Sequence, residues 1–129
     1  MLNPSTADAA EDDPTIRRCV SFAKREGCGW LAVLNLFAFR ATKPADMRAA
    51  ADPVGPRNNG YLEAARDLVD GPMIAAWGAH GSFMDRDQVV RAVFGNRLLC
   101  LNVTKGGQPG HPLYVPADTP LRPVPNCMP

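Results

Sequence analysis

A near-unbroken apolar run at residues 30–40, which contains Asn35 and closes with Arg40, constrains the fold of this chain more than any other feature. The run is too short to cross a bilayer as a helix, which needs about 20 residues. Continuous rather than alternating apolar character predicts a strand covered on both faces, as in the centre of a parallel sheet. A buried carboxamide must be hydrogen-bonded, so Asn35 either bonds neighbouring backbone or reads a ligand.

The composition is that of one packed domain. The chain has 129 residues, of which 46% are hydrophobic, and this is enough to form a core. A formal net charge of +1 gives no reason by itself to expect a nucleic-acid or membrane partner. The four cysteines show no C-x-x-C spacing and there are two histidines, so we expect no metal site and no cofactor. Without the features of a signal peptide at the N-terminus, a cytoplasmic protein is expected.

Helix signals alternate with the apolar segments. Asp13 and Pro14 suit the N-cap and the first position of a helix, and Gly27 suits its C-terminal stop. Asn58 or Asn59 is expected to cap a later helix. The expected helices cover residues 14–26, 44–51, 58–69 and 85–94.

The remaining apolar segments are expected to be strands. They are residues 30–40, 73–77 and 98–102. Met1 and Leu2 look like the last residues of a first strand whose bulk would precede Met1, so this strand is expected to be truncated. The alternation of strands and helices predicts an α/β fold of three αβα layers around a central, mainly parallel, four-stranded sheet. Residues 1–116 are expected to form this single domain, and residues 117–129 an irregular, proline-rich tail.

Several longer motifs resemble one family. They are Leu-Asn-Pro-Ser-Thr-Ala-Asp at residues 2–8, Asp-Pro-Thr-Ile-Arg-Arg-Cys at 13–19, Asn-Leu-Phe-Ala-Phe-Arg-Ala-Thr at 35–42, Ala-Trp-Gly at 76–78 and His-Pro-Leu-Tyr at 111–114. Together they resemble a bacterial and phage family catalogued only as a domain of unknown function, and the likeness runs from residue 2 to about residue 116. Members of that family usually carry a full strand before the Leu-Asn-Pro motif, which also implies truncation here.

A more distant likeness lies in three polar residues near the ends of predicted strands, where ligands bind in open α/β sheets. Their order is similar to that of the motifs of the uracil-DNA glycosylase superfamily. Asn3 lies in the first motif, and Asn35 ends the second strand. His111 begins a His-Pro motif near the C-terminus. The resemblance implies cleavage of an N-glycosidic bond to a uracil-like or modified base, with DNA or a nucleotide as the partner.

The resemblance also assigns roles to these residues. Asn3 would position the attacking water, and His111 would stabilise the anion of the departing base. Asn35 would read the edge of a flipped pyrimidine. The remaining expected substrate contacts are Pro4, Ser5, Leu113 and Arg40.

Alternatives stay open at several of these positions. Leu113 is the candidate wedge in the base stack, and Arg40 could meet a phosphate or pair with Asp46. No aromatic residue lies between Asn3 and Asp13 to stack on a base, and Phe37 and Phe39 are the candidate substitutes, although both also suit a core. The alternative function is a non-catalytic domain that binds a nucleotide, a modified base or nucleic acid.

Overall fold

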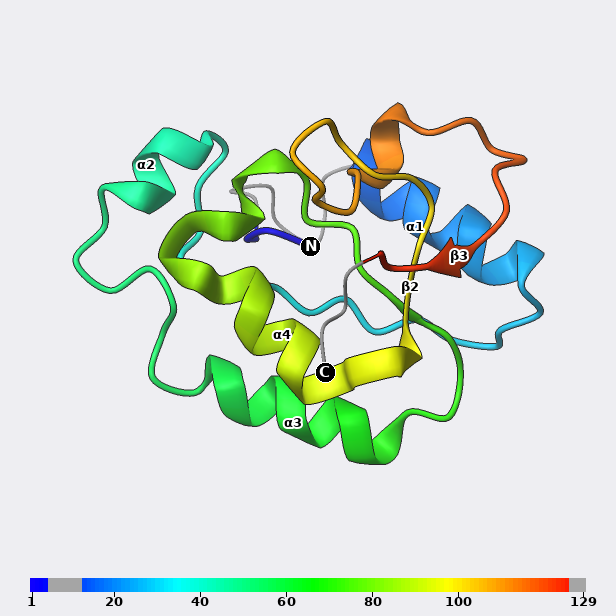
Figure 1. The fold of residues 1–129 in the computed structure, drawn as a ribbon, viewed down its shortest axis with the longest axis horizontal. Helices are drawn as coiled ribbons and strands as arrows, with labels where there is room; N and C mark the ends of the chain where they lie inside the picture. The colour runs from blue at the N-terminus through cyan, green and yellow to red at the C-terminus, as the bar shows by residue number, and fades with distance from the viewer. Residues whose placement is uncertain (5–12, 126–129) are drawn as a thin grey trace.

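The structure of the protein is a computed structural model that describes residues 1–4 and 13–125. Its longer elements are four α-helices and a small sheet, with short 3-10 turns between them (Figure 1). In chain order the elements are α1 (Pro14–Arg25), α2 (Pro44–Arg48), α3 (Asn58–Leu68), β1 (Met73–Ile74), η1 (Ala79–Asp85), α4 (Arg86–Phe94), η2 (Gly95–Arg97), β2 (Leu98–Cys100), η3 (Pro112–Tyr114) and β3 (Arg122–Pro123).

The structure confirms the predicted helices. In α1, Pro14 is the first helical residue and a carboxylate oxygen of Asp13 accepts the N–H of Thr15 at 2.8 Å. This cap satisfies a donor that the first turn of a helix leaves unpaired. The expected capping role of Asn58 in α3 is wrong, because the N-cap of that helix is Arg57.

The predicted four-stranded, mainly parallel sheet between two helical layers is also wrong. The sheet has three short strands in the order β1-β2-β3, in which β1 and β2 are parallel and β2 and β3 are antiparallel. The third strand lies at Arg122–Pro123, within the segment expected to be an irregular tail, and Val124 beside it is buried.

The apolar run at residues 30–40 accounts for most of this difference, because none of it is a strand of the sheet. Leu36 and Phe37 are buried, but Trp30 is 66% exposed and Phe39 is 41% exposed. The Ala38 N–H donates to a carbonyl of the loop before α3 rather than to β1, at 3.1 Å. The prediction failed because the carbonyl groups of Asn35 and Leu36, in the middle of the run, are paired by side chains and not by a neighbouring strand.

Two buried polar side chains supply those partners. The amide nitrogen of Asn58 donates to the carbonyl oxygens of Asn35 and Leu36 at 2.9 and 2.8 Å. The Arg86 Nε also donates to the Leu36 carbonyl, at 2.9 Å. Side chains on α3 and at the start of α4 therefore hold the run in place from one side.

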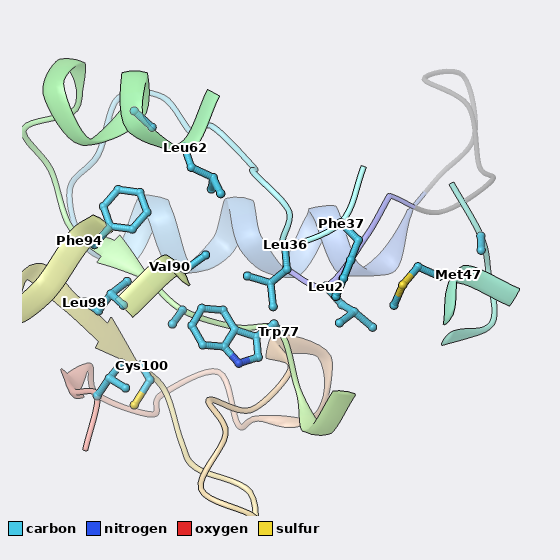
Figure 2. Packing of buried hydrophobic residues seen from close by; sticks show 14 residues of the cluster. Leu2, Leu36, Phe37, Met47, Leu62, Trp77, Val90, Phe94, Leu98 and Cys100 are labelled. Atoms are coloured by element: carbon cyan, nitrogen blue, oxygen red, sulfur yellow. The ribbon is translucent and has the colours of Figure 1, made fainter. Parts of the chain in front are cut away.

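The main core cluster contains side chains of the N-terminal segment, the apolar run, α2, α3, α4 and β2, while Phe22 of α1 packs in a second cluster with Leu101 and Val115. Figure 2 shows Trp77 in the middle of the cluster, between Leu36 and Leu2 on one side and Phe94 and Leu98 on the other. Gly81 permits this packing, because a Cβ at that position would lie 2.0 Å from the Trp77 ring. In the described ranges, no helix has both the length and the apolar character that a membrane crossing requires.

Candidate functional site

An apolar cleft of about 720 Å³ lies between residues 28–36 and residues 68–77. Met1, Asn35 and Pro112 are among its lining residues. Most of the other lining side chains are aliphatic or aromatic. The cleft therefore separates the apolar run from β1.

Asn35 lies beside the first residue of the chain. The Met1 ammonium donates to the Leu34 carbonyl at 3.0 Å, and the Leu36 N–H donates to the Met1 carbonyl at 3.0 Å. These bonds place Met1 opposite Asn35 in a parallel pairing. The Asn35 side chain makes no hydrogen bond within residues 1–4 and 13–125, so its amide can serve a ligand.

Asn3 uses its side chain to hold backbone. Its amide nitrogen donates to the carbonyl oxygens of Phe39 and Ala41 at 3.1 and 3.0 Å. These bonds fix the plane of the amide and occupy its donors. Only the Asn3 oxygen can therefore act on a substrate or a water. Phe39, whose carbonyl accepts one of these bonds, has an exposed ring.

His111 is half-buried and its ring is held in one orientation. Its Nδ1 accepts the N–H of Leu113 at 3.2 Å, and its ring lies 5.5 Å from the ring of Tyr114. Burial, and then the Met1 ammonium, lower the pKa of His111, while Asp13 opposes them. In the neutral ring the proton is therefore on Nε2, which makes that nitrogen a hydrogen-bond donor.

A buried polar network fixes the loop that leads to His111. The Trp77 Nε1 donates to the side-chain oxygen of Gln108 at 2.7 Å. The Gln108 amide nitrogen in turn donates to the Asp87 carboxylate at 3.0 Å. Asp87 is 2% exposed, and Arg91, one turn further along α4, donates to the Gly107 carbonyl at 3.5 Å. The loop is therefore tied both to the segment that follows β1 and to α4.

Helix α1 holds the other side of His111. The Arg18 guanidinium donates to the carbonyl oxygens of Pro112, the first residue of η3, and of Val115, which follows it. Arg18 therefore ties α1 to the backbone of the segment that follows His111.

The structure brings the three principal candidates to one neighbourhood but not into one hollow. Asn35 pairs with Met1, Asn3 follows two residues later, and the Met1 ammonium acts on the pKa of His111. Of the three, Asn35 lines the apolar cleft, whereas Asn3 and His111 are not part of its lining. The neighbourhood of Met1 is therefore the candidate site.

The other predicted contacts are dispersed around it. Leu113 is 39% exposed and borders a second hollow, of about 460 Å³, against α1. Pro4 is half-buried, and its carbonyl accepts the Ala41 N–H at 3.0 Å. Arg40 is exposed beyond the buried part of the run. Ser5 lies outside the described residues.

Sequence reasoning missed the residues that support the site. Asn58, Arg86 and Asp87 are buried polar residues whose roles depend on contacts distant in sequence. Tyr114, which is 81% exposed beside His111, was part of a recognised motif but was given no role. Among the described residues, no group of three His, Cys, Asp or Glu side chains comes together in a way that could hold a metal ion.

Comparison with protein families identifies the chain at the family level. The family described as "Protein of unknown function (DUF1643)" matches residues 1–113. The chain belongs to this family. The DUF1643 match confirms the expected membership of a family of unknown function, and it includes every site residue that was predicted from the sequence. No curated protein and no solved structure matches the chain, and the likeness to the uracil-DNA glycosylase superfamily stays a prediction.

Proposed function

We propose that this protein is a nucleobase- or nucleotide-directed enzyme that hydrolyses an N-glycosidic bond. The observation that supports the proposal is the tautomer and the charge of the His111 ring. Its Nδ1 is occupied by the Leu113 N–H and its pKa is lowered, so the ring presents a neutral Nε2–H donor near pH 7. A preorganised donor of this kind stabilises negative charge as it develops on a departing base.

The remaining steps use atoms near Met1. The bond between the base nitrogen and the sugar carbon breaks, and the base leaves with the electron pair as an anion. The oxygen of Asn3 accepts a hydrogen bond from water and orients it toward the sugar carbon, with which the water oxygen forms a new bond. The proton released by the water passes to the solvent or the base. Asn35 reads the edge of the base through its donor and acceptor atoms.

Two exposed aromatic rings are available for stacking. Phe39 accepts a hydrogen bond from Asn3 through its carbonyl, and Tyr114 contacts the His111 ring. Stacking of a base on one aromatic ring contributes about 1–3 kcal/mol to binding. Phe37 is excluded from this role because it is fully buried against Phe83.

A second candidate function is non-catalytic binding of a nucleotide or modified base. The observation that favours it is the use of the Asn3 amide nitrogen to hold backbone carbonyls, which makes this residue part of the scaffold. A binding domain would still use His111, Asn35 and the two exposed rings, without any water in position for attack.

Incubation with DNA oligonucleotides that contain uracil or modified bases tests the proposal. We expect abasic product with at least one base. His111→Gln should lower the rate about 100-fold, because general acid–base catalysis by a positioned side chain contributes about that much or more. His80→Gln is the matched control, since His80 is exposed on η1 and should leave the rate unchanged. If bases bind but no abasic product forms across the panel, the second candidate function is favoured. If no product forms and no base binds, both candidate functions are contradicted.

A further inference from the structure

Arg86 carries a buried charge that no acidic side chain of the described residues neutralises. The residue is 4% exposed, and its Nε donates to the Leu36 carbonyl at 2.9 Å. Its Nη2 is buried without a hydrogen-bond partner, and Arg86 takes part in no ion pair between described residues. A guanidinium stays protonated at neutral pH, so this positive charge has no counterion within the described parts of the chain.

The acidic residues on either side of Arg86 in the chain do not supply a counterion. Asp85 is exposed. The Asp87 carboxylate accepts from the Gln108 amide at 3.0 Å and lies 3.9 Å from the Arg91 Nε. Burial lowers the pKa of Arg86, as expected for a charge without a carboxylate partner. Burial of an unpaired charge is unfavourable, so Arg86 is suited to an anion that comes from outside the chain.

The start of α4 adds backbone donors to this guanidinium. Arg86 is the first residue of the helix, and the side chain of the N-cap, Asp85, makes no hydrogen bond to the first turn. The N–H groups of a first helical turn and the helix dipole favour an oxyanion. Met84 and Asp85 have positive φ values of 55° and 54°, a strained backbone conformation that is common at functional sites. Met84 is 55% exposed, so the turn that leads to Arg86 lies at the surface.

The guanidinium also lies beside the backbone of the proposed base-reading residue. The Leu36 carbonyl that accepts from Arg86 also accepts from the Asn58 amide, at 2.8 Å. The same amide donates to the Asn35 carbonyl at 2.9 Å. Asn58 and Arg86 thus meet at the residue that follows Asn35. A nucleotide whose base contacts the Asn35 side chain can therefore place an anionic group near Arg86.

We propose that Arg86 and the first turn of α4 bind an oxyanion, and that this oxyanion is the phosphoryl group of a nucleotide substrate. The hydrogen bond to Leu36 fixes the plane of the guanidinium and leaves Nη2 to donate to a phosphoryl oxygen. Other phosphoryl oxygens accept from N–H groups of the first helical turn. The oxyanion site stands on the buried charge, whereas its assignment to a nucleotide rests on the proposed function. The substrate is accordingly phosphorylated, as a nucleotide or within DNA, and is not a free base or nucleoside.

Thermal unfolding in inorganic phosphate tests the site without any base. We expect the melting temperature of the parent protein to rise saturably with sodium phosphate, relative to sodium chloride at the same ionic strength, because phosphate binds the folded state. Arg86→Gln removes the charge and should weaken phosphate binding about tenfold or more, since hydrogen bonds to a charged group are lost. Arg66→Gln is the matched control and should bind phosphate like the parent protein, because Arg66 is exposed on α3.

The NMR resonance of the Arg86 Nε–H gives a second readout, which requires only the parent protein and stays available if Arg86→Gln does not fold. This resonance should shift saturably as phosphate is added. Uridine monophosphate should bind the parent protein about tenfold more tightly than uridine, because its phosphoryl group adds hydrogen bonds to a charged side chain. The preference should be absent in Arg86→Gln.

The oxyanion site is overturned if phosphate has no effect beyond that of chloride, if Arg86→Gln binds phosphate like the parent protein, or if the Arg86 resonance stays fixed. Equal binding of uridine and uridine monophosphate would overturn the assignment to a nucleotide. A phosphate effect that depends on Arg86, in a protein that releases no base from any oligonucleotide, would support the oxyanion site and contradict only the glycosidase proposal.

Discussion

At the scale of single residues, Asn58 is the clearest test of how the apolar run is held. Asn58→Ala removes the donors to the carbonyl groups of Asn35 and Leu36, which lie in the interior. We expect the free energy of unfolding to fall by about 1–3 kcal/mol in urea denaturation, because buried acceptors are left unpaired. The adjacent Asn59→Ala is the matched control. Asn59 is exposed on the same helix, and its replacement should change stability by less than about 0.5 kcal/mol.

Two glycines should respond in opposite directions to the same substitution. Gly81→Ala places a methyl group against the buried Trp77 ring, so we expect a loss of about 1–3 kcal/mol in stability. Gly60→Ala meets no atom within 4 Å inside α3, so we expect a gain of about 0.5–1 kcal/mol from helix propensity. Thermal unfolding of both variants measures this difference, and melting temperatures that change in the same direction would refute the packing of Trp77 described above.

Single residues also show where sequence reasoning succeeds. The role of Asp13 as a cap depends on its nearest neighbours in the chain, and it was predicted correctly. Asn58 has an equally good local signature for a cap, but its amide satisfies carbonyls 22 and 23 residues away. Nothing in the local pattern separates these two cases.

At the scale of elements, the loop before His111 depends on Gln108. Gln108→Leu removes the acceptor of the Trp77 N–H and a donor to the Asp87 carboxylate. We expect a loss of about 2 kcal/mol in the free energy of unfolding and weaker base binding, because a hydrogen bond to a charged group is lost. Gln88→Ala is the control, since Gln88 is exposed and contacts Asp87 only at 3.5 Å. Equal stability of the two variants would mean that the network does not anchor the loop.

Elements were predicted well where their signals were local. Helix α1 has a cap, a stop and apolar periodicity within its own residues, and α4 has apolar periodicity within its own residues; both are present. The run at residues 30–40 has an apolar character that fits a buried strand, but this character does not specify which backbone groups pair with it. Those pairings come from Asn58, Arg86 and Met1, at distant positions in the chain.

At the scale of the whole molecule, stability should depend on pH through two buried bases. Burial lowers the pKa of the Met1 ammonium from 8.0 to about 6, and it also lowers the pKa of His111 from 6.5. The unfolded chain therefore binds protons before the folded chain as the pH falls. In a chain that starts at Met1, we expect the free energy of unfolding to decrease from pH 8 to pH 6 through Met1, and below about pH 6.5 through His111.

Urea denaturation between pH 5 and pH 8 measures this dependence. His111→Gln should remove the part of the decrease that lies below pH 6.5 and should keep the part above it. His80→Gln is the control and should reproduce the parent profile, because His80 is exposed. An identical profile for all three proteins would show that His111 is not buried in a way that disfavours its charge.

The architecture as a whole was the least predictable level. Counting the apolar segments predicts four strands that alternate with helices. The sheet that forms depends instead on which residues pair between strands: Ile74 pairs with Leu99, and Cys100 pairs with Arg122. The candidate site was predicted as three residues in one hollow. The structure gathers Asn3, Asn35 and His111 around Met1, but of the three only Asn35 lines the apolar cleft.

Whether His111 contacts a nucleobase, as proposed above, is tested most directly by proton NMR, because the chain has two histidines whose resonances can be followed separately. Uracil, uridine monophosphate and modified bases would be titrated at pH 7.5 while the ring resonances of both residues are followed. We predict that one or more of these compounds shifts the His111 resonance saturably and leaves that of exposed His80 unchanged. Resonances that stay fixed for both residues, or move together with every compound, would contradict the claim.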